Sequence, residues 1–160
     1  VKNYKTESFD IITSFEVIEH INNPIDEISS ISQILRTGGL FYCTTPNFNS
    51  FSRFYLKNKW NNIQYPEHLS YYTVPTIKNL LITNNLYPKK TLTTGISLTR
   101  FNTSRLELKG AEIISPTTTD EILRKQLEKR IHFRILKNIL NTFLTWLRLG
   151  DTIKIFAVKK

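Results

Sequence analysis

Two short apolar runs that flank a helical pattern constrain the fold of this chain most strongly. Residues 9–15 and 40–45 are rich in β-branched and aromatic side chains without strict polar alternation. Runs of this kind are typical of parallel strands that are buried on both faces. Since apolar residues recur with helical spacing between the two runs, the sequence of residues 9–45 predicts a βαβ unit with two parallel strands.

The helix between the two runs has clear start and stop signals. Asn23 can cap it, Pro24 suits its first position, and Gly38-Gly39 is the expected stop. Apolar side chains recur at helical spacing, namely Ile25, Ile28, Ile31, Ile34 and Leu35. We therefore expect an amphipathic helix that packs on the predicted sheet.

The rest of the chain continues the alternation of helices and strands. Residues 47–72 are polar and aromatic without a clean period, which is typical of a lid or binding loop. Thr73 can cap a second helix that ends at Asn84-Asn85, and residues 86–108 have an extended pattern. A long helical pattern over 120–149 precedes a last strand at 151–160. These elements predict an α/β fold.

Cysteine content and charge exclude several classes of protein. The only cysteine, Cys43, cannot form an internal disulfide or a thiolate-rich zinc site, so we expect a reducing, cytoplasmic compartment. The net charge is +9, and residues 119–160, with 10 basic and 4 acidic side chains, carry two thirds of it. The aromatic side chains of that region include Phe143 and Trp146, which have the pattern of core residues. We therefore do not favour a nucleic-acid partner.

Several short stretches together resemble a class I S-adenosylmethionine-dependent methyltransferase. They are Phe9-Asp10-Ile11-Ile12, Glu16-Val17-Ile18-Glu19-His20, Leu35-Arg36-Thr37-Gly38-Gly39-Leu40 and Thr45-Pro46-Asn47. Further on, Pro66-Glu67-His68-Leu69 and Tyr72-Thr73 resemble the branch that includes the ubiquinone-biosynthesis O-methyltransferases. The order and spacing of these stretches are more specific than any one of them. The resemblance implies a Rossmann-like fold and S-adenosylmethionine as the cofactor.

The chain departs from the family pattern before its first predicted strand. The resemblance places residues 9–15 at the fourth strand of the family fold, so the first three strands and the glycine-rich cofactor loop are absent. We therefore expect a partial Rossmann-like fold over residues 1–160. It would comprise a core and lid at 9–99, a helical insertion at 119–149 and a last strand at 151–160. We also expect weak cofactor binding by this chain alone.

The resemblance assigns roles to residues that follow the predicted strands. Ser14, Phe15 and Glu16 would lie against the cofactor, although Phe15 also suits a core position. His20 is the candidate general base, because an imidazole accepts a proton near neutral pH, but it also suits a turn cap. The expected substrate-binding residues are Asn47, His68 and Tyr72. Asn47 also suits the turn after Pro46.

A metal site is a further hypothesis. Glu16, Glu19, His20 and His68 supply carboxylates and imidazoles that would hold Mg²⁺ or another divalent ion. This set resembles the small-RNA terminal 2′-O-methyltransferases, in which a metal gathers two hydroxyl groups. The same residue types occur in many methyltransferases without evident metal chemistry, so a metal-free site is favoured.

Three functions remain open from the sequence. The first is a methyltransferase fragment that acts on a small-molecule acceptor, at an oxygen atom. The second is a non-catalytic remnant or interaction module, and the third is a metal-dependent RNA 2′-O-methyltransferase. Independently of these, the apolar residues 135–149 with nearby Arg134, Lys137 and Arg148 are typical of a helix that contacts an anionic membrane or a partner protein.

Overall fold

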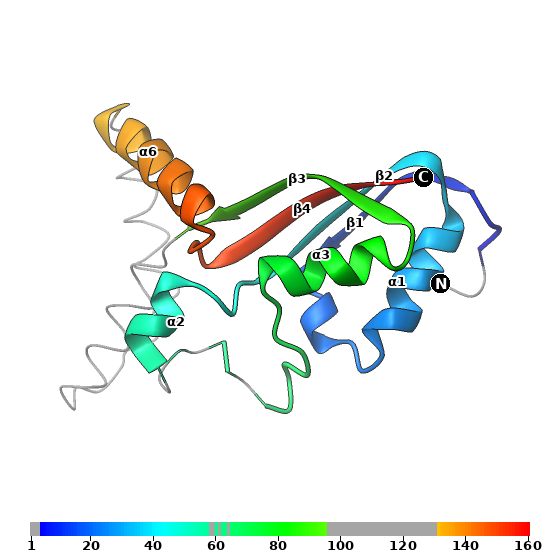
Figure 1. The fold of residues 1–160 in the computed structure, drawn as a ribbon, viewed down its shortest axis with the longest axis horizontal. Coiled ribbons are helices and arrows are strands. Elements are labelled where there is room, and N and C mark those ends of the chain that lie inside the picture. Colours follow the sequence, from blue (N-terminus) through cyan, green and yellow to red (C-terminus); the bar gives the residue numbers. More distant parts are fainter. Residues whose placement is uncertain (1–3, 58–59, 61, 64, 96–130) are drawn as a thin grey trace.

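The computed structural model describes residues 4–57, 60, 62–63, 65–95 and 131–160, without the side chains of 131–137. A four-stranded sheet with the strand order β1-β2-β4-β3 forms its centre (Figure 1). The strands are β1 (Phe9–Phe15), β2 (Leu35–Pro46), β3 (Leu86–Thr94) and β4 (Thr152–Lys159). The helices are η1 (Ile18–His20), α1 (Pro24–Ile34), α2 (Phe51–Leu56), α3 (Val74–Ile82) and α6 (Ile131–Leu147).

Strand directions bring several chain segments to one edge of the sheet. β1 pairs with β2 in parallel, which confirms the predicted βαβ unit, and β4 is antiparallel to both β2 and β3. Thr152 at the start of β4 pairs with Pro46 and Thr94, where β2 and β3 end. We call this side of the sheet, where β1, β2 and β3 end, the carboxyl edge. In such sheets, ligands bind outside this edge.

The helices α1 and α3 lie side by side on one face of the sheet (Figure 1). Their buried isoleucines and leucines pack on the inner side chains of β2 and β4, and together they form the core. The fully buried members include Ile28, Phe41, Ile77, Leu81 and Ile155. As predicted, Asn23 caps α1 and Thr73 caps α3, the latter through a capping box with Thr76.

Helix α1 ends earlier than the glycine pair predicts. Its last residue is Ile34, and Leu35 already has extended backbone and pairs with Phe9 of β1. Gly38 adopts a φ of +77° within an irregular stretch of β2, between the pairs Phe9–Leu35 and Ile11–Leu40. Leu35 is completely buried in this position. Strand pairing and the burial of Leu35 therefore take the place of the expected last turn of the helix. Gly38 provides the positive φ of the irregular stretch in β2.

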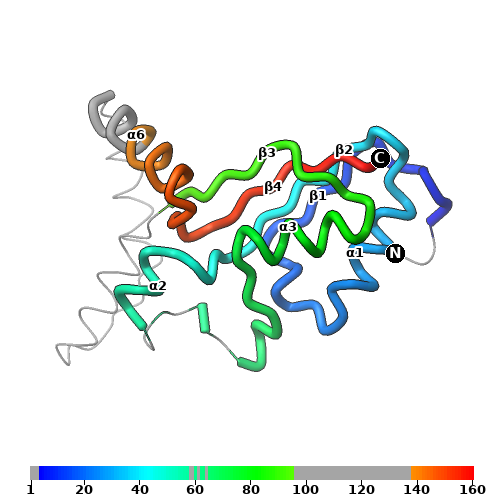
Figure 2. Tube along the Cα trace, viewed as in Figure 1, coloured from blue at the N-terminus to red at the C-terminus, as the bar shows by residue number. Residues whose placement is uncertain are grey.

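The prediction that residues 9–15 are buried on both faces is wrong. No residue of β1 is buried, and the side chains of Ile11 and Phe15 are 60% and 58% exposed. β1 is an edge strand of the sheet, and no described helix covers the face that carries these side chains (Figure 2). On that face the ring of Tyr42 packs against Phe15 and Phe156, at centroid distances of 5.4 and 4.5 Å.

Part of the predicted lid is helical. Helix α2 begins after Ser50, whose hydroxyl accepts a hydrogen bond from the backbone N–H of Arg53. The Arg53 guanidinium lies 4.1 Å from the ring centre of Phe48 and 4.7 Å from that of Phe54. The segment then returns to the sheet, where Asn47 and Tyr72 form a parallel bridge.

Helix α6 confirms the helical pattern only over the described residues, since residues 96–130 lie outside them. The helical pattern over 120–149 includes an apolar stripe with i, i+4 spacing through Ile139, Phe143 and Leu147, which predicts the buried face, but all three side chains are exposed. Leu144 is buried, whereas Phe143 and Trp146 are 54% and 76% exposed, so the prediction that these two aromatics are core residues is wrong. The last turns of α6 contact β3 through Leu144 and Thr145. No helix in the described part of the chain combines the length and hydropathy needed to cross a membrane.

Candidate functional site

Two segments far apart in sequence meet at the carboxyl edge. The short helix η1 follows β1, and the returning lid segment passes beside it. The backbone carbonyl of Glu19 accepts hydrogen bonds from the N–H groups of Leu69 and Ser70, at 2.8 and 3.0 Å. These bonds place the ring of His68 next to that of His20, with 4.7 Å between the ring centres.

The Glu19 carboxylate is buried and only partly paired. Its side chain is 2% exposed, and Oε2 accepts a hydrogen bond of 2.9 Å from the hydroxyl of Thr45. Oε1 accepts no hydrogen bond from any described residue. The Nε2 atom of His20 lies 4.0 Å from Oε1. A buried carboxylate oxygen without a partner is costly, which favours a role in binding.

Both histidine rings are oriented by backbone carbonyl groups. Nδ1 of His20 lies 2.7 Å from the carbonyl oxygen of Glu67, and Nδ1 of His68 lies 2.7 Å from that of Asn62. Because a carbonyl oxygen only accepts, Nδ1 is the protonated nitrogen in each ring, and in the neutral form Nε2 carries the lone pair. Ligating histidines are fixed in the same way in metal sites.

We call Glu19, His20 and His68 the open cluster. One ligand atom from each of the three lies within 4.8 Å of the others. One carboxylate and two imidazoles suit a transition metal or Zn²⁺ better than Mg²⁺, which prefers oxygen ligands. The residues therefore fit a divalent cation, but their donor atoms favour Zn²⁺ or a transition metal over the Mg²⁺ expected from the sequence.

Glu16 is not part of this cluster. It precedes η1 with a φ of +50°, its side chain is exposed, and its backbone N–H bonds to the carbonyl of Thr44. The spacing of three residues between Glu16 and Glu19 would place both on one face of a helical turn, but the chain turns sharply between β1 and η1 and separates them. Of the four predicted metal ligands, the structure brings three together.

The residues expected to contact the cofactor lie at the end of β1. Ser14 is half-buried, Phe15 is exposed, and both are at the carboxyl edge. No glycine follows β1 or β2 before the next helix, so neither turn can approach a ligand as closely as a glycine-rich loop. The described residues therefore fit only one side of a cofactor. The assignment of Ser14, Phe15 and Glu16 stays a prediction.

Asn47 has structural contacts. It is fully buried, and Nδ2 donates to the carbonyl oxygens of Arg148 and Gly150, at 3.0 and 2.7 Å. Its Oδ1 accepts a hydrogen bond from the N–H of Asn49. Tyr72 is also buried, and burial raises the pKa of its hydroxyl. Substrate binding by these two residues stays a prediction, and Asn47 has no exposed atoms for it.

A second set of buried polar residues surrounds Asn47, and we call Asn47, Ser52, Thr93 and Asp151 the latch cluster. Ser52 donates to Asp151 Oδ2 at 2.9 Å, which ties α2 to the start of β4. The hydroxyl of Thr93 donates to the carbonyl of Leu144 at 2.8 Å, which ties β3 to α6. The latch cluster therefore fixes α2 and α6 at the carboxyl edge.

Sequence reasoning missed the groups that support the open cluster. Thr45 orients the Glu19 carboxylate, and the carbonyl groups of Asn62 and Glu67 orient the histidines. The sequence offers one signal for the role of Thr45, which is a hydroxyl side chain in a predicted buried strand, directly before Pro46. No sequence signal identifies the two carbonyl groups, because any residue type provides one.

Comparison with known proteins identifies the family of this chain. A "Methyltransferase domain" family model matches residues 2–89. A ubiquinone biosynthesis O-methyltransferase of Roseobacter denitrificans is 44% identical over 43 residues, which are 27% of this chain and 17% of that protein. Its counterpart in Cereibacter sphaeroides is 34% identical over 56 residues, which are 34% and 23% of the two chains. The matched segments thus span less than a quarter of these relatives.

Solved structures show the same fold over nearly the whole chain. A SAM-dependent methyltransferase of Thermotoga maritima superposes with a TM-score of 0.60 at 18% identity, over 99% of this chain and 59% of that one. One from Archaeoglobus fulgidus gives 0.57 at 17% identity, over 99% and 62%. At this level of identity the likeness concerns the Rossmann-like fold alone. Since the family model covers more than half of its residues, the chain belongs to the methyltransferase-domain family.

Proposed function

We propose that this chain forms the acceptor side of an S-adenosylmethionine-dependent methyltransferase that methylates an oxygen atom of a small molecule. One observation supports this most directly. The buried Glu19 and two oriented histidines meet at the carboxyl edge, where one ligand atom from each of the three lies within 4.8 Å of the others. The names of the ubiquinone biosynthesis O-methyltransferases support oxygen as the acceptor atom.

The cofactor side of the site would involve the end of β1. S-adenosylmethionine supplies, when bound, an electrophilic methyl group on a sulfonium ion. Ser14, Phe15 and Glu16 would line its position, with the exposed ring of Phe15 offering an apolar surface. The contribution of this chain is then to position the acceptor, because an in-line displacement depends mainly on orientation.

His20 would act as the proton acceptor. Its ring is held by the Glu67 carbonyl at Nδ1, which leaves the lone pair of Nε2 for a hydroxyl group of the acceptor. The side chain is 43% exposed, so an acceptor can reach it. Once His20 is protonated, the Glu19 carboxylate 4.0 Å away stabilises the imidazolium. His68, whose ring centre lies 4.7 Å from that of His20, would help to orient the acceptor.

A second candidate uses the same residues as a cation site. A divalent cation held by Glu19, His20 and His68 would bind the acceptor oxygen and lower the pKa of its hydroxyl. The unpaired Oε1 of Glu19 and the backbone bonds at both Nδ1 atoms favour this candidate. The donor set suits Zn²⁺ or Mn²⁺.

Two titrations test these proposals. Calorimetry with S-adenosylhomocysteine compares the 160-residue chain with the same chain in its full reading frame. Binding that appears only with the full reading frame is the result expected for an acceptor-side portion. Absence of binding in both would overturn the proposal and favour a non-catalytic remnant.

Equilibrium dialysis with Zn²⁺, Mn²⁺ and Mg²⁺ tests the cation site separately. We expect Glu19→Gln and His68→Gln each to weaken Zn²⁺ or Mn²⁺ binding at least tenfold. Glu67→Gln is the matched control, since it removes a neighbouring exposed carboxylate and keeps the carbonyl that holds His20. Equal affinity in all four proteins would rule out the cation site and leave His20 as the proton acceptor.

A further inference from the structure

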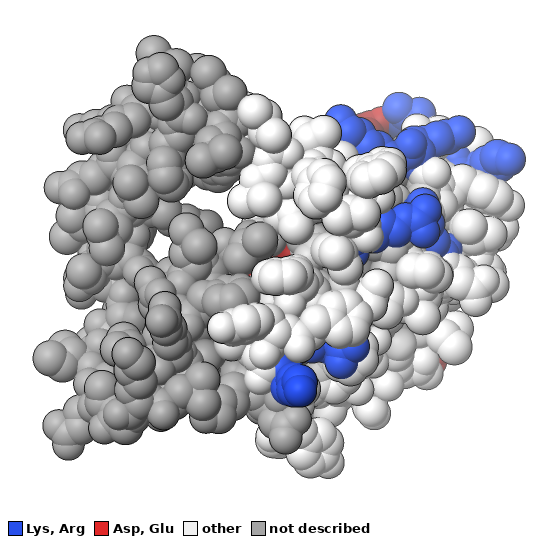
Figure 3. All heavy atoms as spheres, turned by 60° about the vertical axis from the view of Figure 1, so that its left-hand side comes forward, with Lys and Arg blue, Asp and Glu red and all other residues white. Residues whose placement is uncertain are grey.

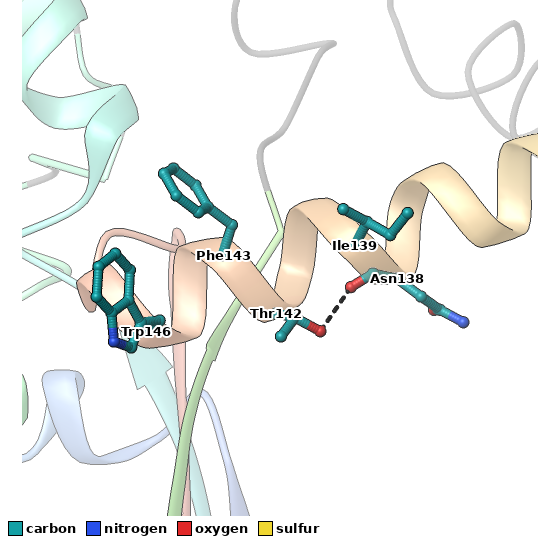
Figure 4. Close-up of a pocket in the computed structure, with 5 residues that line it drawn as sticks. All are labelled: Asn138, Ile139, Thr142, Phe143 and Trp146. Carbon is teal, nitrogen blue, oxygen red and sulfur yellow. Dashed lines mark hydrogen bonds between the residues drawn. The ribbon is translucent and has the colours of Figure 1, made fainter.

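Helix α6 presents an apolar face to solvent. Its exposed residues include Ile139, Leu140, Phe143, Trp146 and Leu147. Ile139, Phe143 and Trp146 also line a shallow hollow, together with the polar residues Asn138 and Thr142 (Figure 4). Monomeric proteins rarely leave such a continuous apolar surface exposed without a binding function.

Helix α2 lies at the same end of the molecule as α6 (Figure 1). Phe51, Phe54 and Tyr55 are exposed on it. The backbone N–H of Phe51 donates to the carbonyl of Leu149 at 2.8 Å, so α2 begins beside the end of α6. We call the exposed apolar residues of α2 and α6 the apolar rim. The latch cluster fixes its two helices relative to the carboxyl edge.

The described charges on and beside α2 and α6 are basic. Residues 51–57 and 138–149, whose side chains the structure describes, contain Arg53, Lys57 and Arg148 and no Asp or Glu. Figure 3 shows several patches of Lys and Arg and little Asp or Glu on the drawn face, and these patches are not confined to α2 and α6. A two-fold contact between copies of this chain would bring like charges together. The charge pattern therefore favours an anionic partner.

We propose that the apolar rim docks on a bilayer surface that contains anionic phospholipid. Exposed Trp, Phe and Leu side chains with flanking Arg and Lys are the composition of helices that lie in the interface of such a membrane. The open cluster lies at the same edge of the sheet. Combined with the proposed function, on which this extension rests, docking would give the site access to an amphiphilic acceptor in the membrane.

Vesicle sedimentation with the 160-residue chain tests docking directly, with no cofactor present. We expect binding to vesicles of equal parts phosphatidylcholine and phosphatidylglycerol, and at least tenfold weaker binding to phosphatidylcholine alone or in high salt. The double variant Phe143→Ser, Trp146→Ser should lose at least tenfold in affinity. Ile82→Ser, an exposed apolar residue at the other end of the sheet, is the control and should bind normally.

Two further measurements separate docking from misfolding. Trp146 is exposed whereas Trp60 is buried, so the tryptophan emission should shift to shorter wavelength on vesicles. Trp146→Phe should keep the binding and lose this shift. Arg148→Asn, which suits the φ of +58°, should bind about fivefold more weakly.

The proposal fails if the double variant binds vesicles as well as the unchanged chain does. It also fails if the unchanged chain does not bind and instead forms a dimer that the double variant abolishes in sedimentation equilibrium. Neither result bears on S-adenosylhomocysteine binding, so failure of docking and failure of the proposed function are distinguishable.

Discussion

The latch cluster and the open cluster lie at the same edge of one sheet and differ in how their polar atoms are used. In the latch cluster, Asn47 is fully buried and its side chain makes three hydrogen bonds. In the open cluster, Glu19 has one paired and one unpaired oxygen, and Nε2 of His20 lies 4.0 Å from the unpaired one. Burial of polar groups is common to both. Unused bonding capacity is what distinguishes a candidate site from a structural joint.

The largest expected effect on stability is that of a substitution at Gly150, which packs against Thr93 of the latch cluster. A Cβ atom at this position would overlap the backbone of Thr93 and Thr94. Gly150→Ala should therefore lower the free energy of unfolding by about 3 kcal/mol. Urea denaturation followed by circular dichroism measures this value. Gly95→Ala is the control: its Cβ would meet no atom within 4 Å, and the φ of +84° alone should cost about 1 kcal/mol.

Asn47→Ala should have the next largest effect. It leaves the carbonyl groups of Arg148 and Gly150 without their donor, which should lower the free energy of unfolding by about 2 kcal/mol. Asn49→Ala, at an exposed neighbouring position, should change it by less than about 0.5 kcal/mol. Similar losses for the two variants in urea denaturation would contradict the structural role of Asn47.

Cys43 lies on β2, which leads to Thr45 beside the open cluster and to Asn47 of the latch cluster. Its titration tests how well the folded protein excludes solvent from this strand. Burial, with a smaller contribution from Glu19, raises the pKa of its thiol to about 12 from the ordinary 9.0. The folded state therefore holds the proton more tightly, and the resulting stability is lost as the pH rises from about 9 to 12. By pH 10 the loss should be about 1 kcal/mol relative to pH 8.

Cys43→Ala isolates this contribution from the titration of other groups. Denaturation at pH 8 and pH 10 should show a smaller loss for the variant than for the unchanged chain. Equal losses would indicate that solvent reaches the thiol in the folded protein.

Glu19→Gln should have the smallest effect on stability. The amide can still accept from Thr45, and the change removes a buried charge that is only partly compensated. In the presence of a chelator, the free energy of unfolding should change by less than about 0.5 kcal/mol. A loss of more than 1 kcal/mol would show that Glu19 stabilises the fold as the latch cluster does, and the two clusters would then not differ in role.

Sequence reasoning predicted the elements whose signals are local. The caps at Asn23 and Thr73 and the parallel pairing of β1 with β2 are confirmed. It failed where burial depends on neighbouring elements. β1 is exposed as an edge strand, and α6 buries Leu144 instead of its apolar i, i+4 stripe. Hydrophobic periodicity states which face is apolar, but not whether anything covers it.

The candidate site was predictable to a similar extent. Glu19, His20 and His68 are brought together as the metal hypothesis requires, because the lid bonds back to η1. Glu16 is separated by the turn with positive φ. Asn47 follows β2 as a ligand-binding residue would, and only the structure shows that its amide bonds to the loop before β4.

The exposed edge of β1 has a consequence for assembly. Among the described strands its outer backbone groups have no partner. A further strand that pairs there in parallel would end beside Phe15, and the loop after it would emerge next to η1. Such a segment would complete the sheet and at the same time add a loop beside the open cluster, so the sheet and the candidate site would be extended together.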